Sequence, residues 1–388
     1  MALDDPDHRQ HKTPALRRTV LAGGAGLVGV AAVASCFAVL LRTGRRRSTP
    51  AIQAPIRQDW LDRHNEEILE PELPIIDPHH HLWDRPGYSY LLQDLRADVD
   101  SGHKIVATVF AECGAMYRAS GPPELKSLGE TEFVTGVARK SASVKYGSTR
   151  YIAGIIGYVD LRIGSRAKGV LERHLAVSEG RLRSIRNSSA SHSDPGLKIY
   201  ASAPPGLLLD REFREGFAAL APLGLGFDVW VFQTQLREVV DLARAFPQTT
   251  IVLDHLGGPL AVGPYAGKRE EAFTKWHEGI CEVASCPNVY IKLGGLGMKP
   301  IGFTFYEYDL PPRSQDLERA WRPYIETCIE AFGPQRSMYE SNFPVDKGTC
   351  SYQVLWNAFK RIAAGCSADE KTALFSGAAS KAYQPMQF

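Results

Sequence analysis

The sequence lacks the paired cysteines of a disulfide-rich or zinc-binding scaffold. Its seven cysteines are scattered through 388 residues, and no two of them have CxxC spacing. An odd number of scattered cysteines argues against a disulfide framework and against a structural zinc site. We therefore interpret most of them as buried thiols.

A positively charged surface for nucleic acid is also missing. The first 50 residues hold eight Lys and Arg against three Asp, whereas the remaining chain holds 37 basic and 40 acidic residues. That larger part is mildly acidic, and it has no Arg and Lys cluster interleaved with aromatic residues. We expect no nucleic-acid partner. The composition, 44% hydrophobic and 23% charged, is that of an ordinary globular protein.

Charged residues are absent between Val20 and Leu41. A helix needs roughly 20 apolar residues to cross a bilayer, and Arg17-Arg18 just before this run resembles a twin-arginine export motif. Residues 1–50 are therefore expected to be an export signal or a membrane anchor, which would make the protein periplasmic or membrane-anchored.

Three forms of this leader stay open: a cleaved export signal, an uncleaved anchor, or a lipoprotein signal that ends at Cys36. The basic residues on its two sides are nearly equal in number, so they do not decide its orientation. A cytoplasmic protein with a disordered N-terminal extension is the alternative. Residues 51–72 are expected to be a linker.

From residue 73 onward, short β-branched and apolar runs alternate with helical patterns, as in parallel α/β proteins. The expected strands are 73–77, 105–110, 151–159, 182–186, 225–232, 250–253, 289–293 and 337–339. The expected helices are 167–178, 210–221, 235–245, 269–284, 315–332, 352–363 and 369–382. This alternation predicts the α/β class and a (β/α)8 TIM barrel over residues 73–388. An open doubly wound sheet is the alternative, but no GxGxxG motif follows the first strand.

Two histidines at the end of the first expected strand are the first candidate site residues. Alternate side chains of a strand share a face, so His79 and His81 are expected to point the same way and His80 to point away. Two imidazoles at a strand end form half of a metal site. Their apolar flanks, Ile75-Ile76 and Leu82-Trp83, argue against a surface pair.

A second candidate lies at the end of the expected strand 250–253. Asp254 and His255 follow this apolar run directly, and a glycine turn comes after them. We expect His255 to complete a cluster of three imidazoles and Asp254 to orient a ring nitrogen. The structural alternative is a helix-capping aspartate beside a solvent-facing histidine.

A third candidate is the segment 338–346, at the end of the eighth expected strand. A carboxylate there is suited to binding a metal or to taking the proton of an attacking water. The strand ends of a barrel converge on one rim, where catalytic groups lie. The residues expected to contact substrate at this rim are Trp83, Glu112, Arg186 and Lys292. Arg186 is also expected to hold a carboxylate or an oxyanion, with a structural salt bridge as the alternative.

These segments together resemble the amidohydrolase superfamily, and in particular its amidohydrolase-related branch, which includes lactonases of sugar acids and of pyrone dicarboxylate. The matching patterns are DxHxHxW at Asp77, His79, His81 and Trp83, DHxG at Asp254, His255 and Gly257, and SNxP at Ser341, Asn342 and Pro344. The resemblance spans about residues 73–385. It implies that His79, His81 and His255 bind one divalent metal, zinc or manganese, or polarise a substrate carbonyl without metal.

One position departs from the family pattern. Asn342 stands where the family carries the aspartate that activates water, and an amide is no base. Asp346 is the expected substitute if its loop folds back, and Glu340 is the weaker candidate because strand alternation could point it elsewhere. The fourth expected strand has no lysine for a second metal, so one metal or none is expected. The residues with expected catalytic roles are Arg186, His255, Asn342 and Asp346.

The resemblance implies hydrolysis of a small lactone by activated water. The alternatives are a metal-dependent non-oxidative decarboxylase and a catalytically impaired binding protein, the latter because of Asn342. The expected partner is a small-molecule substrate. Membrane association through residues 1–50 and formation of a homo-oligomer are left open.

Overall fold

Eight parallel strands form the centre of this computed structural model, which describes residues 52–85, 87–143, 146–201 and 203–384. Their order in the sheet follows their order in the chain. They are β1 (Ile75–His80), β4 (Ile105–Ala111), β5 (Arg150–Gly157), β6 (Leu182–Ser188), β7 (Gly226–Trp230), β8 (Ile251–Leu253), β9 (Val289–Leu293) and β10 (Ser337–Tyr339). Backbone hydrogen bonds from His81 N to Phe343 O (2.7 Å) and from Asn342 N to His79 O (2.9 Å) join the first and last strand ends. This arrangement is that of a (β/α)8 barrel.

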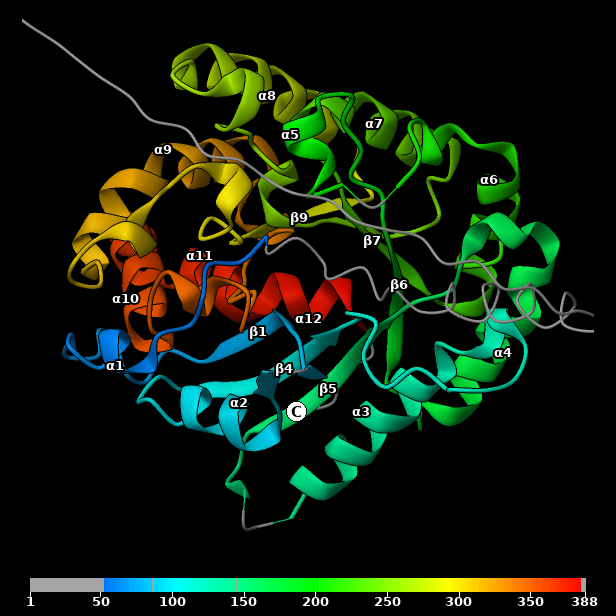
Figure 1. Cartoon of the computed structure of the whole chain (residues 1–388), viewed down its shortest axis with the longest axis horizontal. Coiled ribbons are helices and arrows are strands. Elements are labelled where there is room, and N and C mark those ends of the chain that lie inside the picture. The colour runs from blue at the N-terminus through cyan, green and yellow to red at the C-terminus, as the bar shows by residue number, and fades with distance from the viewer. Residues whose placement is uncertain (1–51, 86, 144–145, 202, 385–388) are drawn as a thin grey trace, which may run out of the picture. The chain divides into compact units, whose positions relative to one another are not determined.

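Helices surround the strands (Figure 1). The longer ones are α2 (Leu92–Val99), α3 (Leu128–Ser141), α4 (Ala167–Val177), α6 (Arg211–Phe217), α7 (Leu236–Ala245), α8 (Arg269–Ala284), α9 (Ser314–Phe332) and α10 (Tyr352–Ile362). The shorter ones are α1 (Gln58–Leu61), α5 (Pro195–Lys198), α11 (Ala368–Thr372) and α12 (Ala378–Ala382). In α7, Leu236, Val239, Val240 and Ala243 recur every three to four residues and are buried. This spacing gives the helix one apolar stripe toward the strands.

Each expected strand corresponds to a strand of the barrel, and each expected helix from residue 167 onward to helical structure. The sequence did not predict α2, α3 or the antiparallel hairpin of β2 (Trp83–Arg85) and β3 (Tyr88–Tyr90). Two glycines and two threonines in α3 have low helix propensity. Its burial against the barrel outweighs that preference.

The inside of the barrel holds an apolar layer toward one end. Ile76, Val109, Val252 and Met338 come from four strands and belong to one cluster of buried side chains with Tyr383 and α12. Figure 1 shows α12 lying across the ring of strands. Because strand side chains alternate, the residues two positions after Val252 and Met338 also point inward. This rule directs Asp254 and Glu340 to the interior, just beyond the apolar layer.

Residues 52–72, expected as a linker, pack against the barrel and belong to the unit Thr49–Phe388. Helix α1 buries Trp60 and Leu61, and Trp60 Nε1 donates a hydrogen bond to Tyr308 O at 3.0 Å.

The expected export signal or anchor at residues 1–50 lies outside the described residues. Among the residues that are described, no helix combines the length and apolar character needed to span a membrane.

Candidate active site

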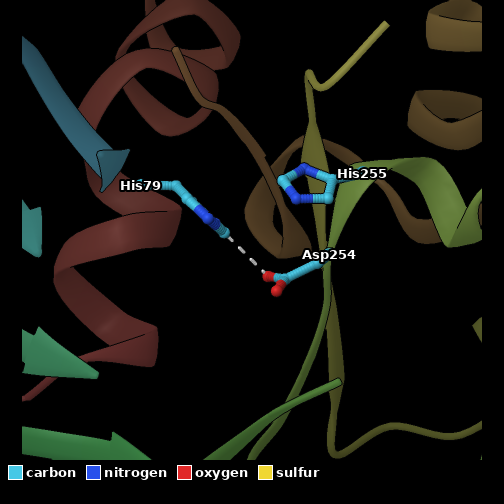
Figure 2. Close-up of side chains that lie close together, drawn as sticks. All are labelled: His79, Asp254 and His255. Carbon is cyan, nitrogen blue, oxygen red and sulfur yellow. Dashed lines mark ion pairs between the residues drawn. The ribbon is translucent and has the colours of Figure 1, made fainter. Parts of the chain in front are cut away.

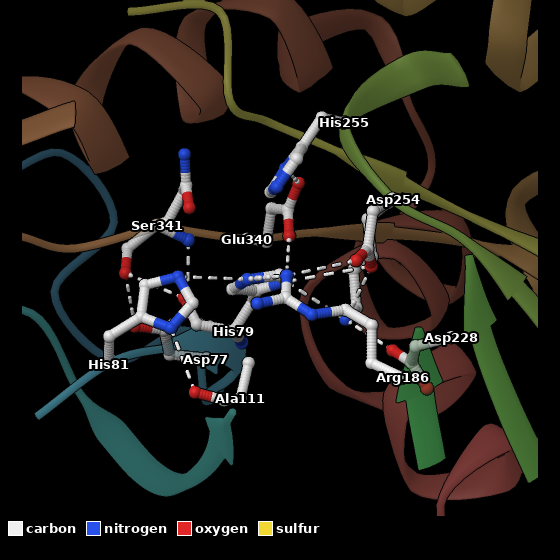
Figure 3. A network of polar contacts seen from close by, with 12 residues as sticks. Asp77, His79, His81, Ala111, Arg186, Asp228, Asp254, His255, Glu340 and Ser341 are labelled. Carbon is white, nitrogen blue, oxygen red and sulfur yellow. Dashed lines mark hydrogen bonds and ion pairs between the residues drawn. The ribbon is translucent and has the colours of Figure 1, made fainter. Parts of the chain in front are cut away.

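Polar side chains from the ends of several strands meet in one network of contacts (Figure 3). The inward-facing set is His79, Arg186, Asp228, Asp254, Lys292 and Glu340. The parallel register places Arg186 beside Asp228 on neighbouring strands, and it pairs Met338, two residues before Glu340, with Lys292. Each of these side chains is at most 8% exposed. Because water is largely excluded, the electrostatic contacts among them are strong.

His79 and His81 lie together at the end of β1, as their spacing predicted. Their Nε2 atoms are 3.3 Å apart, and their ring centroids are 4.9 Å apart. Nδ1 of His81 donates to the carbonyl of Ala111 at 2.8 Å, because a carbonyl can only accept. The Nε2 atom of His81 therefore keeps its lone pair.

The neighbouring imidazole of His80 lies outside this group. It contacts Thr108 Oγ1 at 2.9 Å and packs near Phe110. Burial lowers the pKa of His80 to about 3, so the ring is neutral. This placement is the one that strand alternation predicted.

His255 and Asp254 follow β8 and face His79 (Figure 2). The ring centroids of His79 and His255 are 4.7 Å apart. One ligand atom from each of His79, Asp254 and His255 lies within 4.8 Å of the others. Burial lowers the pKa of His255 despite the carboxylate of Glu340 beside it. A neutral, buried imidazole of this kind is suited to binding a cation.

Glu340 connects two of the rings. Its Oε1 atom is 2.6 Å from Nδ1 of His255, and its Oε2 atom is 3.0 Å from Nδ1 of His79. Burial opposes its ionisation, but the two histidines outweigh burial and hold the pKa of Glu340 at about 2. Glu340 was the weaker candidate from the sequence, because strand alternation could have pointed it elsewhere. Its inward direction follows from Met338, the buried interior residue two positions earlier.

Lys292 is fully buried within the group. Its Nζ atom is 2.7 Å from Asp228 Oδ1, 2.9 Å from Asp254 Oδ1 and 3.0 Å from His79 Nδ1. Burial disfavours the ammonium, but Asp228 and Asp254 outweigh it and raise the pKa of Lys292. Tyr383 donates to the same oxygen of Asp228 at 2.6 Å. Lys292 thus supports the histidines, and its expected contact with substrate stays a prediction.

Arg186 occupies the more open side of the group, with 8% exposure. Its Nε donates to Glu112 Oε1 at 2.9 Å. One terminal nitrogen lies 3.3 Å from both Asp254 Oδ2 and His79 Nε2. Burial disfavours the charge, but Glu112 and Asp254 raise the pKa of Arg186, so it stays cationic. Arg186 therefore forms a salt bridge with Glu112 and also lies beside the ring of His79.

Trp83 supports the site from one side. Its ring stacks on His81 with 5.9 Å between centroids and 25° between planes. The guanidinium of Arg85 lies over the ring of Trp83, 4.1 Å from the ring centroid. The indole therefore fixes the orientation of His81, and it is 2% exposed.

The loop after β10 folds back and brings Asn342 to Asp346. Asn342 Nδ2 donates to Asp346 Oδ1 at 3.0 Å, and Gly297 N donates to Asp346 Oδ2 at 3.0 Å. Burial raises the pKa of Asp346 to about 7 in spite of these two donors. This carboxyl group therefore changes its protonation near neutral pH, which is useful for proton transfer.

The histidine geometry fits a divalent metal. Two imidazole nitrogens bound to one tetrahedral ion at about 2.0–2.1 Å stand about 3.3–3.4 Å apart. The Nε2 atoms of His79 and His81 have this separation. Acceptors lie at the opposite ring nitrogens, the Ala111 carbonyl for His81 and Glu340 for both His79 and His255. Metal-bound histidines usually have such partners.

Comparison with known proteins supports this interpretation. The model of the amidohydrolase family matches residues 76–384. An uncharacterised protein of Sinorhizobium fredii is 33% identical, with 81% of this chain and 99% of that protein covered. An L-fucono-1,5-lactonase of Burkholderia multivorans is 28% identical, with 79% of this chain and 95% of the lactonase covered.

A solved structure is similar over the same region. An amidohydrolase from Burkholderia multivorans, crystallised with bound zinc, has a TM-score of 0.60 and 27% identity, and the match covers 80% of this chain and 98% of that one. The barrel, the order of the three site segments and the match of the family model over most of the sequence lead to one conclusion. This chain belongs to the amidohydrolase family.

Proposed function

We propose that this protein opens a small lactone by hydrolysis. The observation that carries the proposal is the cluster of His79, His81 and His255 at the carboxyl ends of the strands, in a chain similar to L-fucono-1,5-lactonase. The substrate class is a lactone of a sugar acid or of a related ring acid. A barrel fold alone would not support this proposal, because barrels carry many chemistries.

The residues suited to holding a divalent metal are His79, His81 and His255. Asp254 is close enough to His79 and His255 to join these two, but both of its oxygens already face cations, Lys292 and Arg186. A bound zinc or manganese ion would polarise the lactone carbonyl and acidify water. The same imidazoles and Arg186 face one another closely enough that polarisation of a carbonyl without metal is the second form of the proposal.

The protein groups divide the remaining work. Arg186 directs one terminal nitrogen of its cationic guanidinium at His79, which suits an anionic oxygen on the substrate or the oxyanion that forms during attack. Asp346 is our candidate for the proton acceptor from water. Each of its oxygens accepts one hydrogen bond in the structure and retains a second lone pair. Asn342 positions Asp346 and is not itself the base.

A panel of sugar-acid and pyrone lactones tests the proposal. Acid release at constant pH would be measured with added zinc, with added manganese and after chelation. We expect turnover of at least one lactone, and loss of that turnover in the double variant His79→Ala, His81→Ala. The exposed His277 offers a control, His277→Ala, which should retain turnover.

The same panel separates the alternatives. Release of carbon dioxide from an aromatic or sugar acid, without lactone opening, would replace hydrolysis by decarboxylation. Ligand binding without turnover of any lactone would favour a binding protein.

For residues 1–50 we propose export or membrane anchoring on the basis of Arg17-Arg18 and the uncharged run that follows. Cell fractionation of the full chain beside an Arg17→Lys, Arg18→Lys variant tests this. Recovery of both in the cytoplasm would contradict the proposal.

A further inference from the structure

We propose that Glu340 is the positioning residue of the metal site: its carboxylate accepts hydrogen bonds from Nδ1–H of His255 and of His79, so that both rings present their Nε2 lone pairs to a divalent cation. This inference rests on the proposed metal-dependent function. It gives a role to Glu340, which lies two residues before the position where the family carries its aspartate.

The contact with His255 carries the first step. At 2.6 Å, Glu340 Oε1 and His255 Nδ1 are as close as a strong charge-assisted hydrogen bond allows. Glu340 is a fully buried carboxylate, and its two oxygens lie within 3.0 Å of a ring nitrogen of His255 and of His79. An ionised carboxylate can only accept. The proton must therefore be on Nδ1 of His255, and Nε2 keeps its lone pair.

The second oxygen of Glu340 faces His79, where it has a competitor. Nδ1 of His79 is 3.0 Å from Glu340 Oε2 and also 3.0 Å from Lys292 Nζ. An ammonium can only donate, so Lys292 favours a lone pair on this nitrogen, and Glu340 favours a proton on it. The two neighbours thus select opposite tautomers of the same ring.

The other side of His79 decides between them. Its Nε2 atom faces His81 Nε2, which carries a lone pair because His81 donates from Nδ1 to Ala111. A terminal nitrogen of Arg186 also lies 3.3 Å from His79 Nε2, and because a guanidinium can only donate, this contact favours a lone pair on Nε2. A divalent cation between the two Nε2 atoms would require the proton to be on Nδ1, where Glu340 accepts it.

This arrangement gives the interior position of Glu340 a specific use. A buried carboxylate without a function needs only a cation or donors, and Lys292 or Arg186 could supply them from within the same group. Glu340 instead directs one oxygen at His79, in β1, and the other at His255, which follows β8. One side chain thereby prepares two ligands of the same site, as a carboxylate behind a metal-bound histidine commonly does for one.

Zinc affinity of Glu340→Gln tests the assignment, with Glu112→Gln as the matched control. Both variants remove one negative charge from a buried carboxylate of the same group, but Glu112 contacts Arg186 and no ring. Zinc alone would be titrated in competition with a chromophoric chelator. We expect Glu340→Gln to weaken zinc binding about 10- to 100-fold and Glu112→Gln to weaken it much less. Equal losses in the two variants would overturn the proposal, because loss of charge alone would then explain them.

Nitrogen NMR of the metal-free wild-type protein with ¹⁵N-labelled histidine gives a second readout that needs no variant to fold. At about pH 9, above the usual titration range of histidine, His255 should show a protonated Nδ1 and an unprotonated Nε2. With zinc bound, His79 should also show a protonated Nδ1 and an unprotonated Nε2. A proton on Nε2 of His255 in the wild type would overturn the proposal.

These measurements separate failure of the inference from failure of the proposed function. A protein that shows the expected tautomers and binds zinc but opens no lactone would refute the proposed reaction and leave the role of Glu340 intact. A lactonase in which Glu340→Gln binds zinc as tightly as the wild type would do the reverse.

Discussion

Asn342 donates a hydrogen bond from Nδ2 to Oδ1 of Asp346 at 3.0 Å. The amide stands where the amidohydrolase family usually has an aspartate, and an aspartate could not donate to this oxygen. The exchange therefore does two things at once. It removes one carboxylate from the site, and it supplies a donor that, together with Gly297 N, fixes the carboxylate of Asp346.

Asn342→Asp is expected to destabilise the protein by about 1–3 kcal/mol at pH 8, because it replaces a buried donor by a second carboxylate. Urea unfolding measures the effect. The double variant Asn342→Asp, Asp346→Asn restores one donor and one acceptor with their positions exchanged. It should recover most of the loss, and a double variant no more stable than the single one would show that the two side chains are not coupled.

Asp346→Asn is expected to lower kcat/KM about 10²- to 10⁴-fold on any lactone that the wild type hydrolyses, since a proton acceptor is lost. Burial raises the pKa of Asp346 to about 7, and an acceptor acts only when deprotonated. Wild-type kcat/KM should therefore rise with pH through about 7 and level off above it. The variant should lack this rise. A variant that keeps the same acid limb would exclude Asp346 as its origin.

Removal of a bound metal should lower both activity and thermal stability. A ligand that binds only the folded state at 100 times its Kd contributes about 2.7 kcal/mol. Calorimetry before and after dialysis against a chelator measures this contribution, and added zinc or manganese should restore it. The variant His79→Ala, His81→Ala should unfold at the same temperature with and without metal. An undiminished response in that variant would place the metal elsewhere.

Lys292→Met is expected to cost about 3–5 kcal/mol, because it leaves Asp228 and Asp254 without their shared buried cation. Lys275→Met is the control. Lys275 also pairs with a carboxylate, Glu271 at 2.7 Å, but both side chains are more than half exposed. Its urea midpoint should stay close to that of the wild type. Similar shifts in both variants would contradict the importance that we give to burial.

Acid should destabilise the protein through buried histidines away from the site. Burial lowers the pKa of His174 to about 4, and the ring contacts Ser127 and Thr131. The unfolded chain binds this proton near pH 6.5, so the stability from the neutral ring is present above that pH. It is lost as the pH falls toward 4, at about 1.4 kcal/mol per pH unit.

The matched variant for this effect is His174→Gln, which has no titrating ring. Its urea midpoint should fall less steeply between about pH 6.5 and the folded pKa of about 4 than that of the wild type. Parallel slopes in the two proteins would assign the acid sensitivity to other groups.

Sequence periodicity was sufficient for the barrel but not for every part around it. The runs at 289–293 and 337–339 coincide with β9 and β10, and the helix expected at 269–284 coincides with α8. The apolar residues of these segments recur with the period of a strand or a helix, so the pattern is visible within a few residues. Helix α3 and the segment 52–72 lack such a pattern. Their structure depends on packing against parts of the chain that are distant in sequence.

The histidine cluster could likewise be expected from local order. His79 and His81 share a face because they are two residues apart, and His255 directly follows an apolar strand. The direction of Glu340 could also have been inferred, by counting two residues from Met338. The sequence could not show which of its possible partners Glu340 would contact.

Local sequence by itself thus determined the element types, the strand ends and the kinds of side chain gathered there, because side-chain direction along a strand repeats every two residues. Only the tertiary structure decided that Lys292 and Glu340 meet at one nitrogen of His79 and that Arg186 stands at the other. Those contacts join residues more than 100 positions apart. They depend on the stagger between strands around the closed barrel, and a shift of one residue in any strand would direct its side chain away from the interior.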